Sequence, residues 1–103
     1  MNVYINNKEL EKLYTTGKSK KFKLPNYVVN KFFATVQKIE NATDIYDLWN
    51  NRGLRFESMQ GSKNRYSLRL SGKYRLEMEV DWADDEQTKG DFILITISNH
   101  YKN

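Results

Sequence analysis

The chain has 103 residues, which is enough for one hydrophobic core and too few for two, so residues 1–103 are expected to form a single domain. Its hydrophobic fraction of 39% argues against disorder. With no cysteine and one histidine, a disulfide framework, a thiolate nucleophile and a zinc site of the usual kind are excluded. No apolar stretch is long enough to span a bilayer, and the first residues do not resemble a signal peptide, so we expect a cytoplasmic protein without a membrane partner.

The charge distribution favours an anionic partner. Seventeen Lys and Arg against 13 Asp and Glu give a net charge of +4. Four of the six residues 18–23 are lysines, whereas residues 81–91 contain five acidic side chains. Local basic clusters of this kind suit nucleic acid, RNA above all, although a solvated surface has the same composition.

The first half of the sequence predicts helices. Asn6 or Asn7 is placed to cap a short helix that Gly17 ends. Pro25 is placed to open a second helix, in which apolar residues recur at helical spacing up to Ile39. A short helical turn that packs on the core, closed by Gly53, is expected next from three apolar residues, Ile45, Leu48 and Trp49.

The basic segment 18–23 has two interpretations. Its lysines and Phe22 could follow a nucleic-acid backbone, with the phenyl ring stacking on a base. Alternatively the segment is a solvated linker whose Phe22 packs inward, and this interpretation is favoured.

The second half of the sequence predicts a sheet. Residues 65–80 alternate between apolar and polar, with Gly72 in the middle, as in an antiparallel hairpin with one buried face. Residues 92–97 are apolar on both faces, which is typical of an interior strand, and the acidic segment 81–91 becomes a solvated hairpin loop. The expected fold class is α+β, with two N-terminal helices on one face of a small, mainly antiparallel twisted sheet.

The hairpin leaves two registers open. If residues 71–73 form the loop, Arg69 lies directly opposite Arg75, and such a like-charged pair usually implies a carboxylate or phosphate between the two. If residues 72–74 form the loop, Arg69 instead meets Glu77 in an ordinary surface ion pair.

Other candidate groups come from turns and the C-terminal end. Lys63 and Arg65 lie on a basic turn suited to phosphate contacts. His100 is the only side chain whose ordinary pKa lies near neutrality, and it follows the predicted interior strand. A single histidine near a C-terminus is more often a surface residue than a catalyst.

Five segments in this order resemble a known family. They are residues 10–17 (LEKLYTTG), 55–61 (RFESMQG), 66–70 (YSLRL), 73–76 (KYRL) and 98–101 (SNHY). Together they resemble the HigB-like plasmid-maintenance killer toxins of the RelE/ParE superfamily. The resemblance extends over nearly the whole chain and implies a RelE-like fold.

The resemblance implies the toxin of a type II toxin-antitoxin system. Such a toxin is a ribosome-dependent mRNA interferase, a metal-independent endoribonuclease without a cofactor that cuts messenger RNA on the ribosome. Its partners would be that messenger and a HigA-like helix-turn-helix antitoxin.

The resemblance also assigns candidate residues. Arg69, Arg75 and His100 match family positions, whereas Glu57 stands where the family often has a histidine and Gln60 where it often has a lysine. Ser98 and Asn99 likewise replace an Asp-Tyr pair. We predict Glu57 as general base, Arg69 and Arg75 as phosphate ligands and His100 as general acid. The predicted RNA contacts are Arg55, Lys63, Arg65 and Lys73.

Two other functions remain open. A non-nuclease ParE-like toxin that acts on a protein target such as gyrase would share the fold without needing acid-base residues. A catalytically weakened RNA-binding member would use the basic surface alone. In either case Glu57 could simply form a salt bridge with a neighbouring arginine.

Overall fold

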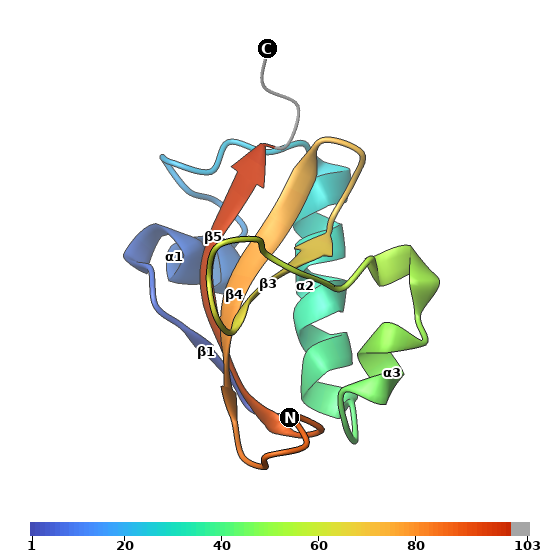
Figure 1. The fold of residues 1–103 in the computed structure, drawn as a ribbon. Helices are drawn as coiled ribbons and strands as arrows, with labels where there is room; N and C mark the ends of the chain where they lie inside the picture. Colours follow the sequence, from blue (N-terminus) through green and yellow to red (C-terminus); the bar gives the residue numbers. More distant parts are fainter. Residues whose placement is uncertain (100–103) are drawn as a thin grey trace.

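The computed structural model describes residues 1–99 and shows an α+β fold (Figure 1). Its five-stranded sheet has the order β1-β5-β4-β3-β2, antiparallel except for β1 and β5, which are parallel. In chain order the elements are β1 (Val3–Ile5), α1 (Lys8–Thr16), α2 (Asn26–Asn41), α3 (Tyr46–Trp49), the 3₁₀ helix η1 (Arg52–Leu54), β2 (Glu57–Ser58), β3 (Arg65–Arg69), β4 (Tyr74–Trp82) and β5 (Gly90–Asn99).

The helices and the site-forming segment lie on opposite faces of the sheet. Figure 1 shows α1 and α2 behind the strands, while the chain between η1 and β3 passes in front of β4. Tyr14 of α1 contacts Phe32 and Phe33 of α2 edge-on, with ring centroids 5.8 Å apart in both pairs. The predicted class and the helices on one face are confirmed, and the other face of the sheet is free for polar chemistry.

Both long helices begin where the sequence predicts. The Asn7 side chain accepts hydrogen bonds from the backbone N–H groups of Glu9 and Leu10, and Gly17 ends α1 with a φ of 78°. Pro25 directly precedes α2, and this helix presents one face of buried residues to the core. Gly53 lies inside η1 and does not close the preceding segment, so that detail of the prediction is wrong.

The strand β1 was not predicted. It has three residues, and its place in the sheet depends on pairing with residues 92–94 of β5. A stretch this short carries no readable alternation, because the period-2 pattern needs about 4–8 residues.

A β-bulge in β5 changes which side chains face the core. Glu77 pairs with Thr96 and Met78 pairs with Leu94, so Ile95 is an extra residue. Leu94 is therefore buried before the bulge and Ile97 after it. The apolar residues on both faces of this segment correctly indicated an interior strand. Some of them alternate irregularly because the bulge reverses which side chains face the core.

Phe22 is 6% exposed and joins the core, so the inward-packing interpretation of the basic segment is confirmed.

Within the part of the chain that the structure describes, none of the helices has the length and apolar character needed to cross a bilayer.

Asn7 connects α1 to the bulge. Its side-chain oxygen caps the helix, and its Nδ2 donates to the carbonyl oxygen of Ile95 at 3.0 Å. We expect Asn7→Ala to lower the free energy of unfolding by about 2 kcal/mol, of which about 1 comes from the cap and about 1 from the lost bond. Urea denaturation monitored by circular dichroism measures this change.

Asn6→Ala is the matched control, since the exposed Asn6 side chain has no hydrogen bond among residues 1–99 and its backbone N–H donates to the carbonyl oxygen of Leu94. We expect it to change stability by less than about 0.5 kcal/mol. Equal losses in both variants would show that the cap and the link to β5 do not stabilise the fold.

Candidate functional site

The polar face of the sheet carries the candidate site. Strand pairing places Glu57 opposite Ser67 and Ser67 opposite Glu77, and in the adjacent row Arg69 lies opposite Arg75. The core residues of the same strands alternate with these and point to the helices. Three antiparallel strands, β2, β3 and β4, thus contribute polar side chains to one surface.

The register of the hairpin is the one that brings the two arginines together. Leu68 pairs with Leu76, Arg69 pairs with Arg75, and the backbone N–H of Leu70 donates to the carbonyl oxygen of Tyr74 at 2.9 Å. Residues 71–73 form the turn, so the alternative register with Arg69 opposite Glu77 is wrong. Two guanidinium groups therefore start from directly opposed positions, as expected for a site that binds an anion.

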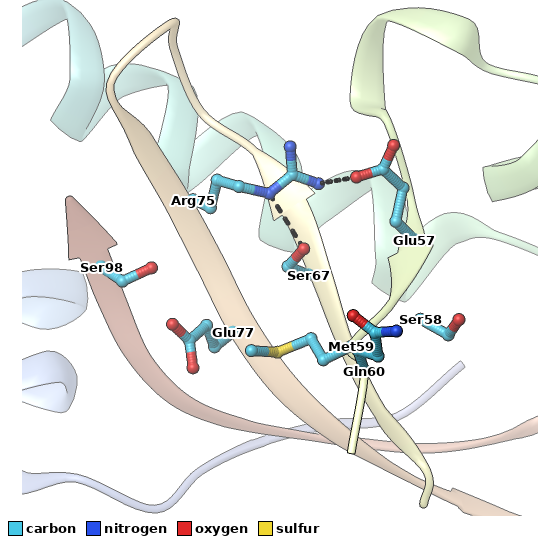
Figure 2. A pocket seen from close by; sticks show the side chains of 8 residues that line it. All are labelled: Glu57, Ser58, Met59, Gln60, Ser67, Arg75, Glu77 and Ser98. Carbon is cyan, nitrogen blue, oxygen red and sulfur yellow. Dashed lines mark hydrogen bonds and ion pairs between the residues drawn. The ribbon is translucent and has the colours of Figure 1, made fainter. Parts of the chain in front are cut away.

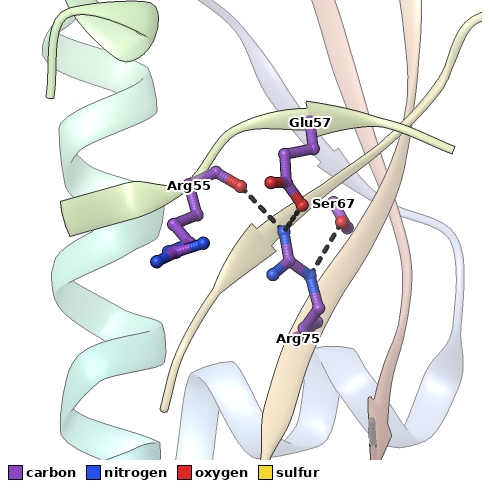
Figure 3. A network of polar contacts seen from close by, with 4 residues as sticks. All are labelled: Arg55, Glu57, Ser67 and Arg75. Atoms are coloured by element: carbon purple, nitrogen blue, oxygen red, sulfur yellow. Dashed lines mark hydrogen bonds and ion pairs between the residues drawn. The ribbon is translucent and has the colours of Figure 1, made fainter. Parts of the chain in front are cut away.

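Arg75 is the anchored member of the pair. It is 8% exposed, and its Nε donates to the hydroxyl of Ser67 at 2.9 Å. Its Nη2 donates to the carbonyl oxygen of Arg55 at 2.8 Å and lies 3.0 Å from Oε1 of Glu57 (Figure 3). These contacts involve Nε and Nη2, so Nη1 has no hydrogen-bond partner within residues 1–99 and is available for an anion.

Arg69 differs from its partner in having no ion pair or side-chain hydrogen bond among the described residues. One of its terminal nitrogens lies 3.9 Å from the position that a Cβ on Gly72 would occupy, so the guanidinium lies beside the turn. The site thus combines one arginine fixed in place with one that is free to close on a ligand.

The carbonyl that holds Arg75 depends on an unusual backbone conformation. Arg55 has φ 46° and ψ 55°, the left-handed conformation that costs a non-glycine residue about 1–2 kcal/mol. Figure 3 shows its carbonyl oxygen directed at Arg75 while its own side chain points away from the Glu57–Arg75 pair. This conformation places backbone strain at the candidate site, and such strain is often found at functional sites.

A pocket of about 350 Å³ lies beside the ion pair (Figure 2). Glu57 stands at one rim with a side chain 56% exposed, so its carboxylate can reach both Arg75 and a ligand in the pocket. The lining residues are Glu57, Ser58, Met59, Gln60, Ser67, Arg75, Glu77 and Ser98.

The other predicted residues differ in exposure. Lys63 and Lys73 are exposed on turns, whereas Arg65 is half-buried and its Nε is buried without a hydrogen-bond partner among the described residues. Arg55 contributes its carbonyl group to the centre. His100 lies outside the described residues.

Sequence reasoning assigned no role to two members of the site. Ser67 orients the Arg75 guanidinium, and Ser98 reaches the polar face opposite Arg75 only because of the bulge in β5. The alternation in residues 65–70 did place Ser67 on the polar side, which was the one available signal. No group of three or more acidic, histidine or cysteine side chains within residues 1–99 could hold a metal ion.

The conformation of Arg55 leads to a test. We expect Arg55→Gly to leave stability unchanged or raise it by up to about 1 kcal/mol, because relief of the left-handed strain is partly offset by the flexibility of glycine in the unfolded chain. Arg55→Val, whose branched Cβ disfavours this conformation, should lower stability by about 2 kcal/mol. Thermal unfolding of the two variants measures the difference, and similar stabilities would mean that residue 55 is not held left-handed in solution.

Comparison with known proteins gives a structural match. No protein-family model matches the chain, and no curated protein does. Among solved structures, this chain is similar to a YoeB/ParE toxin from Agrobacterium tumefaciens, with a TM-score of 0.58 and 11% sequence identity. The match covers 98% of this chain and 100% of that chain. The similarity at this low identity is one of fold, and the chain therefore has the same fold as that toxin.

Proposed function

We propose that the protein is the toxin of a type II toxin-antitoxin system and acts as a ribosome-dependent, metal-independent mRNA endoribonuclease. The observation that carries this proposal is the opposition of Arg69 and Arg75 beside the Glu57 carboxylate, on the polar face of a fold shared with a toxin. The segments that resemble HigB-like toxins make the HigB type our choice within the superfamily.

The proposed reaction is an attack by an RNA 2′-hydroxyl oxygen on the adjacent phosphorus. Glu57 accepts the proton of the hydroxyl, and the bond from phosphorus to the 5′-oxygen breaks to leave a 2′,3′-cyclic phosphate. Arg69 and Arg75 stabilise the five-coordinate phosphate, and His100 donates a proton to the departing 5′-oxygen.

The contacts of Arg75 support its role as a phosphate ligand. Ser67 and the Arg55 carbonyl orient the guanidinium before any substrate arrives, while Nη1 keeps its donors for a phosphate oxygen. Preorganised donors of this kind stabilise developing charge without the cost of rearrangement during the reaction.

The pairing of Glu57 with Arg75 supports its role as base. A phosphate that enters the pocket competes for Arg75, which frees the exposed Glu57 carboxylate beside the ribose. Arg55, Lys63, Arg65 and Lys73 then contribute contacts to the RNA backbone, and these contacts need no particular sequence.

The proposal includes two partners. One is messenger RNA on the ribosome, in keeping with the net charge of +4. The other is a HigA-like helix-turn-helix antitoxin, which would neutralise the toxin.

A non-nuclease toxin is the second candidate. In the free protein the Glu57 carboxylate forms an ordinary ion pair with Arg75, which is also what a purely structural role would give. This observation favours a ParE-like toxin that acts on a protein target such as gyrase, or a weakened RNA-binding member of the superfamily.

Induced expression followed by mapping of 5′ ends in cellular messenger RNA tests the proposal. We expect cuts within translated regions, a loss of cleavage of about 100-fold or more in Arg75→Ala from the missing cation, and a loss of about 100-fold or more in Glu57→Gln from the missing base. Glu57→Gln retains an oxygen that can accept from Arg75, so the fold should be preserved. Arg69→Ala and His100→Ala should also lower cleavage.

Lys89→Ala is the matched control, because it removes one cation from the loop between β4 and β5, at the opposite end of the sheet from the β3–β4 turn. It should cleave like the parent. Parental toxicity in the Glu57, Arg75 and His100 variants alike would refute the assigned roles. Arrested growth with intact messengers and a DNA-damage response would instead support a protein target, and normal growth would support an RNA-binding module.

A further inference from the structure

A second basic surface lies at the same end of the sheet as the arginine pair. Lys21 and Lys23 line a groove of about 360 Å³ together with Tyr74 of β4 and Asn99 of β5. Tyr74 directly precedes Arg75 in the chain. In Figure 1 the segment between α1 and α2 lies beside the C-terminal end of β5, which agrees with this position.

The groove and the pocket beside Arg75 lie at the same ends of β4 and β5, but successive residues such as Tyr74 and Arg75 point to opposite faces of the sheet. Ser98 lines that pocket, whereas Thr96 and Asn99 line the groove. Arg75 pairs with Ser98 across the two strands. A single strand that continues from Arg75 to the groove crosses β5, which lies about 4.8 Å from β4, and passes round its edge.

The segment that carries the lysines is held in shape. The Ser19 hydroxyl donates to Oε1 of Glu9 at 2.8 Å, and the backbone N–H of Lys20 donates to the same oxygen at 3.2 Å. The hydrogen bond from Ser19 lowers the pKa of Glu9 below its usual range. Phe22 anchors the segment in the core, so the two flanking lysines are presented outward at little further cost in chain entropy.

The charges around the groove are not neutralised by the protein. The ion pair between Glu57 and Arg75 is the only one within residues 1–99, so neither Lys21 nor Lys23 has a carboxylate partner there. The acidic loop between β4 and β5 lies at the other end of the sheet from the β3–β4 turn. The two lysines and the arginine pair thus form one basic end of the molecule.

We infer that the groove lined by Lys21 and Lys23 is a second RNA subsite, which binds backbone phosphates of the single strand that continues from the arginine pair across β5. The inference rests on the proposal that RNA is the substrate. It gives the basic segment a binding role while its Phe22 serves the core.

The test measures binding and needs no cleavage. The probe is a fluorescein-labelled single-stranded RNA of about 12 nucleotides, a length within the range of known single-strand sites, with 2′-O-methyl groups that block the nucleophilic hydroxyl. Fluorescence anisotropy gives its affinity between about 50 and 200 mM salt. Each phosphate contact to a single strand adds about 0.7 to the steepness of log affinity against log salt, so K21Q/K23Q should lower it by about 1.4.

K38Q/K89Q is the control, since it removes the same charge from the end of α2 and from the β4–β5 loop, away from the groove. It should keep the parental salt dependence, and circular dichroism checks that both variants are folded. An equal change in both variants, or a parental slope in K21Q/K23Q, would overturn the subsite; an acidic protein surface would then be the next class of partner to test.

The outcomes separate this inference from the proposed function. If K21Q/K23Q flattens the salt dependence but the parent cleaves no messenger in cells, the subsite stands and the nuclease proposal fails. If the parent cleaves messenger and K21Q/K23Q binds RNA like the parent, only the subsite fails. A parent that does not bind the probe would overturn the subsite, whereas the mapping of messenger cuts in cells decides the nuclease proposal on its own.

Discussion

The site depends on the pairing register of β3 and β4. Opposing Arg69 and Arg75 costs some tenths to about 1 kcal/mol, but a slip of one residue would move Leu68, Leu76 and their apolar neighbours from the core to water. Each such side chain loses about 1.5–3 kcal/mol on exposure, so burial outweighs the repulsion several times over. Burial thus fixes the face that the two cations share, and the turn at residues 71–73, closed by the hydrogen bond from Leu70 to Tyr74, sets them directly opposite each other. The repulsion between them is available for an anion to relieve.

Arg75 is held in one orientation by three partners. A hydroxyl, a carbonyl oxygen and one carboxylate surround a guanidinium that is 8% exposed. The planar fork of arginine matches this arrangement, which the flexible stem of a lysine does not. The left-handed conformation of Arg55 is part of the same arrangement, because it directs the carbonyl towards Nη2. The strain at Arg55 lowers the stability of the fold, but it orients the Arg75 side chain. Backbone strain of this kind is common at binding and catalytic sites.

Asn7 and the bulge connect the helical layer to the site. The Asn7 side chain caps α1 and also bonds the carbonyl oxygen of Ile95, the extra residue of β5. Beyond that residue the alternation reverses, which brings Ser98 to the face that carries Arg75. The same topology puts the β3–β4 turn and the end of β5 at one end of the sheet and the acidic loop at the other. A molecule with a modest net charge of +4 thereby acquires one distinctly basic end.

The sequence by itself determined the features that depend on neighbouring residues. Asn7, Gly17 and Pro25 mark helix ends through local backbone chemistry, and the alternation in residues 65–80 places both arginines on the polar face. Only the tertiary structure decided between the two hairpin registers, between an inward and an outward Phe22, and whether Glu57 meets Arg75. It also decided the place of β1 and the reversal of phase in β5. These features join segments far apart in the chain, and their energies depend on burial and pairing that no local pattern records.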